Sequence, residues 1–162
     1  MSYTISEYRL NMIDKKPSLI VKQNFERDHD LNLLTDQDYE QLSIFLVEEL
    51  QLNESYIEYT YVFFYDAFSR CLGFYETNHG DTCSAYVSIR ELFIAALLSG
   101  AKKIIFIHNH PGIEEEWLIP SEADIALTSV LEQNAKTLDM ELVEHIIIGA
   151  NGYHCLKKDE TF

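Results

Sequence analysis

The second half of the chain alternates short apolar runs with segments that carry the signals of a helix start. Residues 103–107 form an almost wholly apolar run, and 142–148 form a second expected strand. Between them, Ser121 precedes an acidic turn in the manner of an N-cap, and the helix is expected to reach about Leu138. Because strands that alternate with helices assemble into one sheet covered by those helices, we predict an α/β fold. The prediction is a single three-layer domain with a mixed central sheet and helices on both faces.

The remaining elements are assigned from the same kinds of pattern. Strands are expected over 2–12, 19–25, 56–65, 71–76, 82–87 and 153–156, with turns at 15–17, 68–70 and 78–81. Helices are expected over 35–52, capped by Thr35, and from a capping box at 88–91 to Leu98, closed by Gly100. We treat residues 1–34 as an N-terminal extension of strands and 35–162 as the main domain. At 162 residues and 47% apolar content, the two form one compact unit.

The charge balance restricts the class of partner. The chain carries 12 basic and 27 acidic residues, for a formal net charge of −15. Nucleic-acid binding depends largely on neutralising phosphates, so this balance argues against direct DNA or RNA binding. A basic or neutral partner, such as a basic peptide, fits the charge better.

The sequence also bears on the compartment. Its three cysteines include no Cys-X-X-Cys pair, which favours buried thiols in a reducing environment. The N-terminus lacks a basic start followed by an apolar stretch, and the longest apolar run, Leu92 to Leu98, is far shorter than the ~20 residues of a membrane span. We therefore expect a cytoplasmic protein without a membrane segment. A homo-oligomer stays open, because the N-terminal strands offer a sheet edge for symmetric pairing.

The residues that carry chemistry follow the apolar run at 103–107. His108 and His110 are two positions apart, a spacing that points both side chains to the same side of an extended strand. Two neutral imidazoles so placed can bind one zinc ion. Asp124, in the first turn of the helix begun by Ser121, is well placed as the third ligand. Three protein ligands and one open position are typical of a catalytic zinc site.

Simpler explanations exist for each part of this pattern. A His-X-His pair alone is often a surface coincidence, and Asp three residues after Ser is usually a capping box. Their joint occurrence after a buried strand, with Pro111 stiffening the exit, favours a metal. Other zinc patterns are absent from the sequence, including His-Glu-X-X-His and the Pro-Cys-X-X-Cys of base deaminases.

The segment from Ile104 to Asp124 resembles the JAB/MPN metalloprotease superfamily and its JAMM motif, which consists of an upstream Glu, His-X-His-Pro and Ser-X-X-Asp. The chain is most similar to the bacterial RadC-like branch, without the N-terminal helical module of longer members. The stretches that carry the resemblance are 90–93, 108–111, 124–128 and 144–149. It covers roughly Glu49 to Leu156 and implies a JAB/MPN-like domain with an architecture similar to that of cytidine deaminases.

The resemblance implies roles for individual residues. His108, His110 and Asp124 would bind one Zn²⁺ per chain. Ser121 would hydrogen-bond the bound water or the developing oxyanion. The upstream Glu matches Glu58, which would act as general acid and base.

Two features of the sequence leave room for alternatives. Glu91 is a rival for the upstream Glu, although it already serves as the expected capping partner of Ser88. The family usually has seven residues between the second His and the Ser, whereas ten intervene here. The added residues include Glu115 and Trp117, which we expect at the substrate rim, where they would retune or block access or bind a partner.

These observations lead to three functional hypotheses. The first is a zinc-dependent hydrolase, a metallopeptidase or isopeptidase acting on a peptide or protein. The second is a non-catalytic JAB-like module for protein interaction, supported by the acidic insertion. The weakest is a nucleic-acid-processing protein, in line with the DNA-repair label attached to the RadC-like group.

Overall fold

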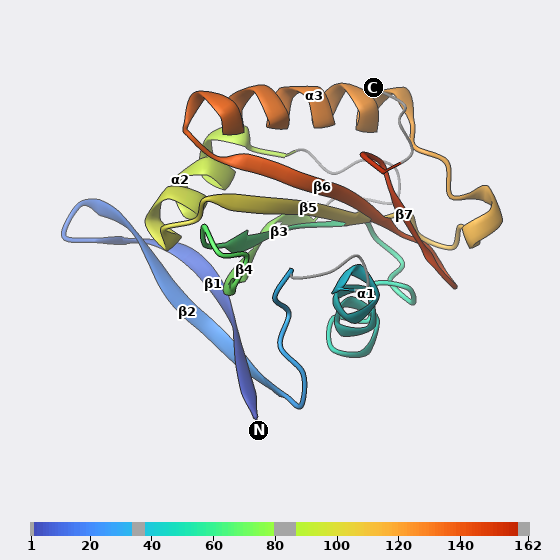
Figure 1. The fold of residues 1–162 in the computed structure, drawn as a ribbon, viewed down its shortest axis with the longest axis horizontal. Coiled ribbons are helices and arrows are strands. Elements are labelled where there is room, and N and C mark those ends of the chain that lie inside the picture. The colour runs from blue at the N-terminus through green and yellow to red at the C-terminus, as the bar shows by residue number, and fades with distance from the viewer. Residues whose placement is uncertain (1, 34–37, 80–86, 159–162) are drawn as a thin grey trace.

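The computed structural model describes residues 2–33, 38–79 and 87–158. Within them, seven strands form one mixed sheet in the order β2-β1-β4-β3-β5-β6-β7 (Figure 1). The strands are β1 (Tyr3–Ile13), β2 (Lys16–Arg27), β3 (Tyr59–Tyr65), β4 (Cys71–His79), β5 (Lys103–Asn109), β6 (Glu141–Ile148) and β7 (Tyr153–Cys155). The helices are α1 (Asp38–Glu48), α2 (Ile89–Ser99) and α3 (Glu122–Thr137), with a short 3-10 helix, η1 (Glu115–Trp117). The β1–β4 and β5–β6 pairs are parallel, and the other neighbours are antiparallel.

Helices cover both faces of the sheet, with α1 on one side and α2 and α3 on the other (Figure 1). Alternate residues of the central strands supply two separate cores. Phe63 and Ile105 pack with Phe45 of α1, whereas Val62 and Phe106 pack on the side of α2 and α3. The predicted three-layer α/β architecture is confirmed.

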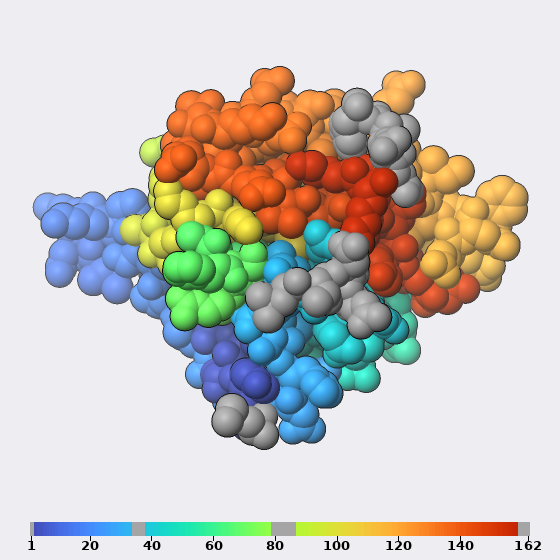
Figure 2. Space-filling view, in the orientation of Figure 1, coloured from blue at the N-terminus to red at the C-terminus, as the bar shows by residue number. Residues whose placement is uncertain are grey.

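The N-terminal hairpin extends the sheet and projects from its edge (Figures 1 and 2). Its turn lies at Asp14 and Lys15, which both have positive φ, so the turn expected at 15–17 begins one residue earlier. Pro17 already belongs to β2, an edge strand, where a missing N–H is tolerated.

Several element bounds differ from those expected. Helix α1 ends at Glu48 rather than near Leu52, because Gln51 takes a positive φ and Leu52 enters the core with 1% exposure. Strand β3 begins at Tyr59, since Tyr56 is 81% exposed. Strand β4 continues through His79, past the start of the turn expected at 78–81. The cap at Thr35 and the strand expected at 82–87, apart from Val87, lie outside the described residues.

The helix starts agree better with the sequence. Ser88 caps α2 by accepting a hydrogen bond from the Glu91 backbone N–H, and Gly100 closes the helix in the left-handed conformation. Ser121 caps α3 as predicted. No helix in the described ranges has both the length and the apolar character needed to cross a membrane.

Gly73 allows β1 to join the sheet. It lies in β4 with φ of +122°, a conformation that side chains rarely adopt. A Cβ atom there would overlap the backbone oxygen of Ser6 and the ring of Tyr8, both in β1. The approach of β1 therefore requires a residue without a side chain at this position.

We predict that Gly73→Ala destabilises the fold by about 3 kcal/mol or more, because backbone strain and steric overlap add. Gly100→Ala is the matched control: its φ is also positive, at +78°, but a Cβ atom added there would meet no other atom within 4 Å. That change should cost about 1–2 kcal/mol. Urea denaturation of both variants measures the difference, and equal losses would contradict the steric role of β1.

Candidate metal centre

His108 and His110 lie at the carboxyl end of β5. This strand is held between β3 and β6, so its backbone position is set from both sides. His108 follows Phe106 on the face covered by α3 and is only 2% exposed. His110 comes one residue after the strand, and its backbone N–H donates to the Ile148 carbonyl at 2.9 Å.

Asp124 reaches the two histidines from the first turn of α3. Ser121 and Asp124 form a reciprocal capping box. Asp124 Oδ2 accepts hydrogen bonds from Ser121 N and Oγ, both at 2.7 Å, and Ser121 Oγ accepts from Asp124 N at 3.2 Å. The cap orients the carboxylate toward the end of β5.

The three side chains converge on one point. His108 Nε2 lies 3.0 Å from His110 Nε2 and 3.1 Å from Asp124 Oδ1, and His110 Nε2 lies 3.5 Å from Asp124 Oδ2. Ligands about 2.0–2.1 Å from a tetrahedral zinc ion are about 3.3 Å apart. The donor set and its spacing therefore fit a zinc ion bound by His108, His110 and Asp124.

The electrostatics of Asp124 favour the ionised ligand. Burial alone would raise the pKa of this carboxyl group. The contacts with His108 and His110 and the hydrogen bond from Ser121 together outweigh burial. They hold the pKa of Asp124 well below its usual range. Asp124 is therefore a carboxylate over the whole physiological range of pH.

A second layer of buried residues supports His108. His108 Nδ1 lies 2.8 Å from Nε2 of His145 in β6, and His145 Nδ1 lies 2.6 Å from Thr128 Oγ1 in α3. Thr128 Oγ1 also donates to the Asp124 backbone carbonyl at 2.7 Å. Burial, reinforced by His108, keeps the pKa of His145 well below its ordinary value, so the ring is uncharged.

Asn109, between the two histidines, ties the segment that carries Glu58 to β5. Its Oδ1 accepts from the Tyr59 backbone N–H at 2.7 Å, and its Nδ2 donates to the Ile57 carbonyl at 3.1 Å. Glu58 is half-buried and immediately precedes β3. Thr60, two residues after Glu58, pairs with His108, so the side chains of Thr60 and His108 lie on the same face of the sheet.

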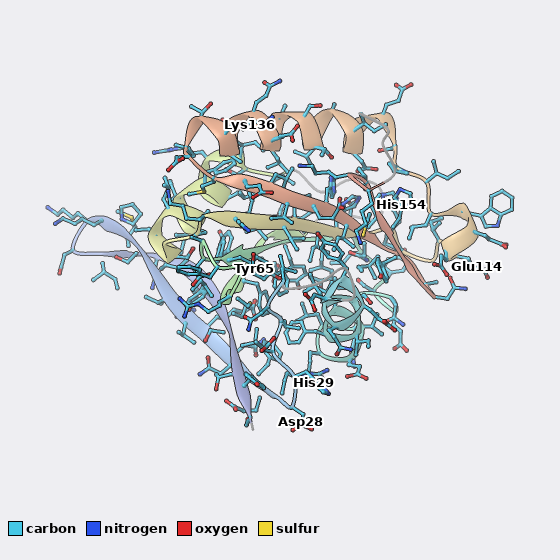
Figure 3. The ribbon with its side chains drawn as sticks, in the orientation of Figure 1. Asp28, His29, Tyr65, Glu114, Lys136 and His154 are labelled. Atoms are coloured by element: carbon cyan, nitrogen blue, oxygen red, sulfur yellow. The ribbon has the colours of Figure 1, made fainter. Side chains whose placement is uncertain are left out.

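The segment between His110 and Ser121 forms a lip, which we define as residues 111–120. Two hydrogen bonds, both 2.7 Å long, join the lip to the β6–β7 turn. The Ala150 N–H donates to the Ile113 carbonyl, and the Glu115 N–H donates to Asn151 Oδ1. Trp117 is 68% exposed, and its ring N–H donates to Glu116. Figure 3 shows Glu114 of the lip at the outer edge of the molecule, far from Tyr65 in the interior.

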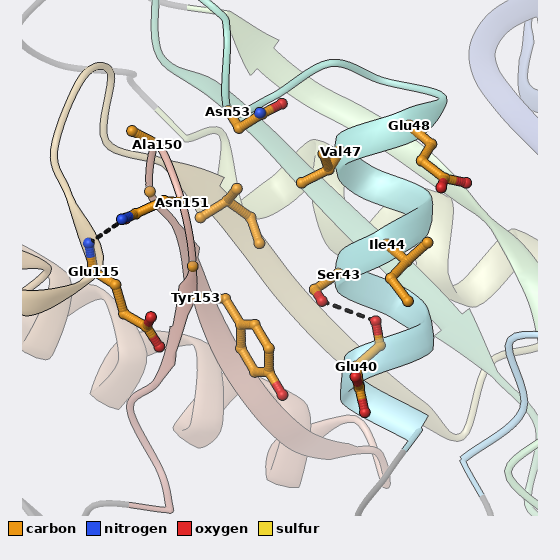
Figure 4. A pocket seen from close by; sticks show the side chains of 13 residues that line it. Glu40, Ser43, Ile44, Val47, Glu48, Asn53, Glu115, Ala150, Asn151 and Tyr153 are labelled. Carbon is orange, nitrogen blue, oxygen red and sulfur yellow. Dashed lines mark hydrogen bonds between the residues drawn. The ribbon is translucent and has the colours of Figure 1, made fainter.

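Glu115 also lines a groove of about 440 Å³ between α1 and the β6–β7 turn (Figure 4). The apolar walls of the groove include Val47 of α1 and Tyr153 of β7, and Glu40 and Glu48 add negative charge. The lining includes none of the three candidate metal ligands. The predicted rim residue Glu115 thus borders a groove separate from the histidines, and Trp117 stands in solvent.

The sequence patterns assign no role to three residues of this region. His145 enters only as part of the resemblance, and Thr128 and Asn109 receive no role of their own. The 144–149 stretch offers a weak signal, because Glu144 and His145 interrupt the apolar residues of a strand. The contact of Thr128 with His145 and the hydrogen bonds of Asn109 join residues that are distant in the sequence, so no local pattern indicates them.

Comparison with known proteins agrees with this geometry. The family model of the RadC-like JAB domain matches residues 37–161. A UPF0758 protein of Fusobacterium nucleatum is 30% identical over 146 residues, which cover 89% of this chain and 61% of the relative. A UPF0758 protein of Methanosarcina acetivorans is 39% identical over 83 residues (51% of this chain and 34% of the relative), and one of Chlorobium phaeovibrioides is 33% identical over 84 residues (52% and 36%).

These alignments span between about a third and three fifths of the relatives' own length. The family match includes all three converging side chains and the whole of α3. It agrees with the resemblance expected from the His-X-His-Pro and Ser-X-X-Asp stretches. The chain belongs to the RadC-like JAB domain family.

Proposed function

We propose that this protein is a zinc-dependent hydrolase that cleaves a peptide or isopeptide bond. The observation that carries the proposal is the convergence of His108, His110 and Asp124. The two Nε2 atoms are 3.0 Å apart, Asp124 Oδ1 lies 3.1 Å from His108 Nε2, and Asp124 Oδ2 lies 3.5 Å from His110 Nε2. Three protein ligands leave one tetrahedral position for water or substrate, which is the pattern of catalytic zinc. Among the described residues, the candidate cluster has no fourth member.

When bound, zinc would polarise the substrate carbonyl and lower the pKa of a water molecule in its open position. Glu58 is the proposed general acid and base: its carboxylate would take the proton of the attacking water and return it to the leaving amine. The register of β3 against β5 supports this role: Thr60 pairs with His108, and the same alternation continued beyond the end of β3 would bring Glu58 to the face of His108.

Ser121 is proposed to act at the same site. Its hydroxyl holds Asp124 in place, and it lies at the N-terminus of α3, where the helix dipole favours negative charge. Because a hydroxyl has one proton, we propose that Ser121 turns it from Asp124 to the developing oxyanion during attack.

The lip and the acidic groove are the proposed contacts for substrate outside the metal centre. Glu115 contributes to both, and Trp117 offers a large exposed apolar surface. Because the protein has a formal net charge of −15, these surfaces favour a substrate with a basic peptide segment. Cys71 and Cys155 form no disulfide in the part of the chain that the structure describes, which accords with a reducing compartment, and we propose the cytoplasm.

We predict that the protein, dialysed first against micromolar zinc and then against metal-free buffer, retains one zinc per chain. His110→Ala should lose the zinc, because His110 Nε2 is one of the three proposed ligand atoms. Glu122→Gln, which removes an exposed acid from the same turn of α3 as Asp124, should retain it. Elemental analysis measures the stoichiometry, and a metal-free wild type would refute the zinc proposal.

Zinc should also stabilise the fold. At a free concentration 100 times its dissociation constant, a ligand that binds only the native state adds about 2.7 kcal/mol. Occupancy should decrease in acid, because both imidazoles must be neutral to bind the metal.

We predict that Glu58→Gln keeps zinc but lowers kcat/KM about 10²–10⁴-fold, the usual contribution of general acid–base catalysis. Glu54→Gln is the control, since it removes an exposed carboxylate four residues earlier. Turnover is measured on libraries of peptides and isopeptide-linked peptides. Full activity of Glu58→Gln would assign the proton transfer to another group, with Glu91 the first to test.

A second candidate function is a zinc-bearing protein-interaction module without catalysis. The observation that favours it is the exposed, acidic lip with Trp117 at its end. In the same library experiment, this alternative expects no cleavage by either the wild type or Glu58→Gln, together with retained zinc in both.

A further inference from the structure

We infer that Thr128 and His145 act as positioning residues that set the tautomer of His108 and so direct its Nε2 lone pair toward the metal position. The purpose of this arrangement rests on the proposed zinc site. The arrangement itself rests on three hydrogen-bond distances between buried atoms and can be tested without metal.

The first link determines the direction of all the others. Thr128 Oγ1 lies 2.7 Å from the Asp124 backbone carbonyl and 2.6 Å from His145 Nδ1. A carbonyl oxygen carries no proton, so the single hydroxyl proton of Thr128 must be donated to Asp124. The hydroxyl oxygen is then an acceptor, and the proton between Thr128 and His145 belongs to His145 Nδ1.

The second link follows from the first. His145 is fully buried, and its uncharged ring carries a single proton. That proton lies on Nδ1, which donates it to Thr128. Its Nε2 is therefore an acceptor. The 2.8 Å contact between His145 Nε2 and His108 Nδ1 requires the proton to lie on His108 Nδ1.

The consequence for the site is specific. With the proton on Nδ1 fixed, the neutral form of His108 can only be the one whose lone pair is on Nε2, the atom that faces His110 and Asp124. Ligand histidines commonly donate their other N–H to a carboxylate or carbonyl oxygen. Here the acceptor is another histidine, which can accept only because Thr128 has removed the alternative tautomer.

The reverse direction does not fit these distances. If His108 Nδ1 were the acceptor, His145 would carry its proton on Nε2, and His145 Nδ1 would need the proton of Thr128. The oxygens of Thr128 and Asp124 would then face each other at 2.7 Å with no proton between them. The chain of hydrogen bonds therefore runs from His108 to His145 to Thr128 to Asp124.

The first experiment measures the tautomers directly. Two-dimensional ¹⁵N–¹H NMR of the histidine rings is recorded on metal-free wild-type protein at pH 8, where exposed histidines are neutral. We expect His145 to show a protonated Nδ1 and an unprotonated Nε2, and His108 to show a protonated Nδ1. The test does not use His108 Nε2, because without metal this atom lies 3.1 Å from the Asp124 carboxylate, which can accept a proton from it. A protonated Nε2 on His145 would overturn the inference, whether or not the protein binds zinc.

The second experiment measures the effect on metal affinity. Thr128→Val keeps the shape of the side chain but lets His145 change tautomer, so Zn²⁺ and Co²⁺ affinity should fall about 10–100-fold. Thr128→Ser restores the hydroxyl and should restore affinity. Thr137→Val is the matched control, because Thr137 makes the same hydroxyl bond to the carbonyl four residues earlier in α3, away from the site.

Isothermal titration and the visible spectrum of Co²⁺ provide the readouts, with circular dichroism to establish that each variant is folded. Equal affinity of Thr128→Val and Thr128→Ser would overturn the inference. If wild-type protein binds neither metal, the zinc proposal fails, and the NMR result still decides the direction of the hydrogen bonds.

Discussion

The carboxylate of Asp124 belongs to two structures at once. One oxygen closes the N-terminus of α3 through the Ser121 backbone and hydroxyl, and the other lies 3.1 Å from His108 Nε2. The dipole of α3 further favours a negative charge at this position. Because α3 is anchored on the sheet by Leu131 and Ala135, the same packing that forms the core sets the distance from Asp124 to β5.

The histidine side of the site depends equally on the sheet. Strand β5 is buried on both faces and paired along both edges, so its carboxyl end is a rigid support for His108. Asn109 extends this support by binding the backbone on either side of Glu58. Two imidazole nitrogens and a carboxylate are thus held close together by the fold itself, which reduces the reorganisation needed when a cation binds.

The lip before α3 packs against the end of the sheet away from the three candidate ligands. Leu118 is buried against Ile147 and Leu156, and hydrogen bonds join the lip to the β6–β7 turn. His110 keeps its place through the bond to Ile148 while the acidic lip extends outward.

Local patterns were sufficient for the parts of the protein whose causes are local. The apolar run of β5, the Ser121 cap and the spacing of His108 and His110 predicted the central strand, the start of α3 and the convergence with Asp124. The sequence placed the end of α1 too late, because Leu52 leaves the helical path to fill a core made by other segments. The roles of Asn109, Thr128 and His145 also escaped prediction. Their hydrogen bonds join residues 17, 37, 50 and 52 positions apart, so proton direction and side-chain partners exist only once β3, β5, β6 and α3 are packed together.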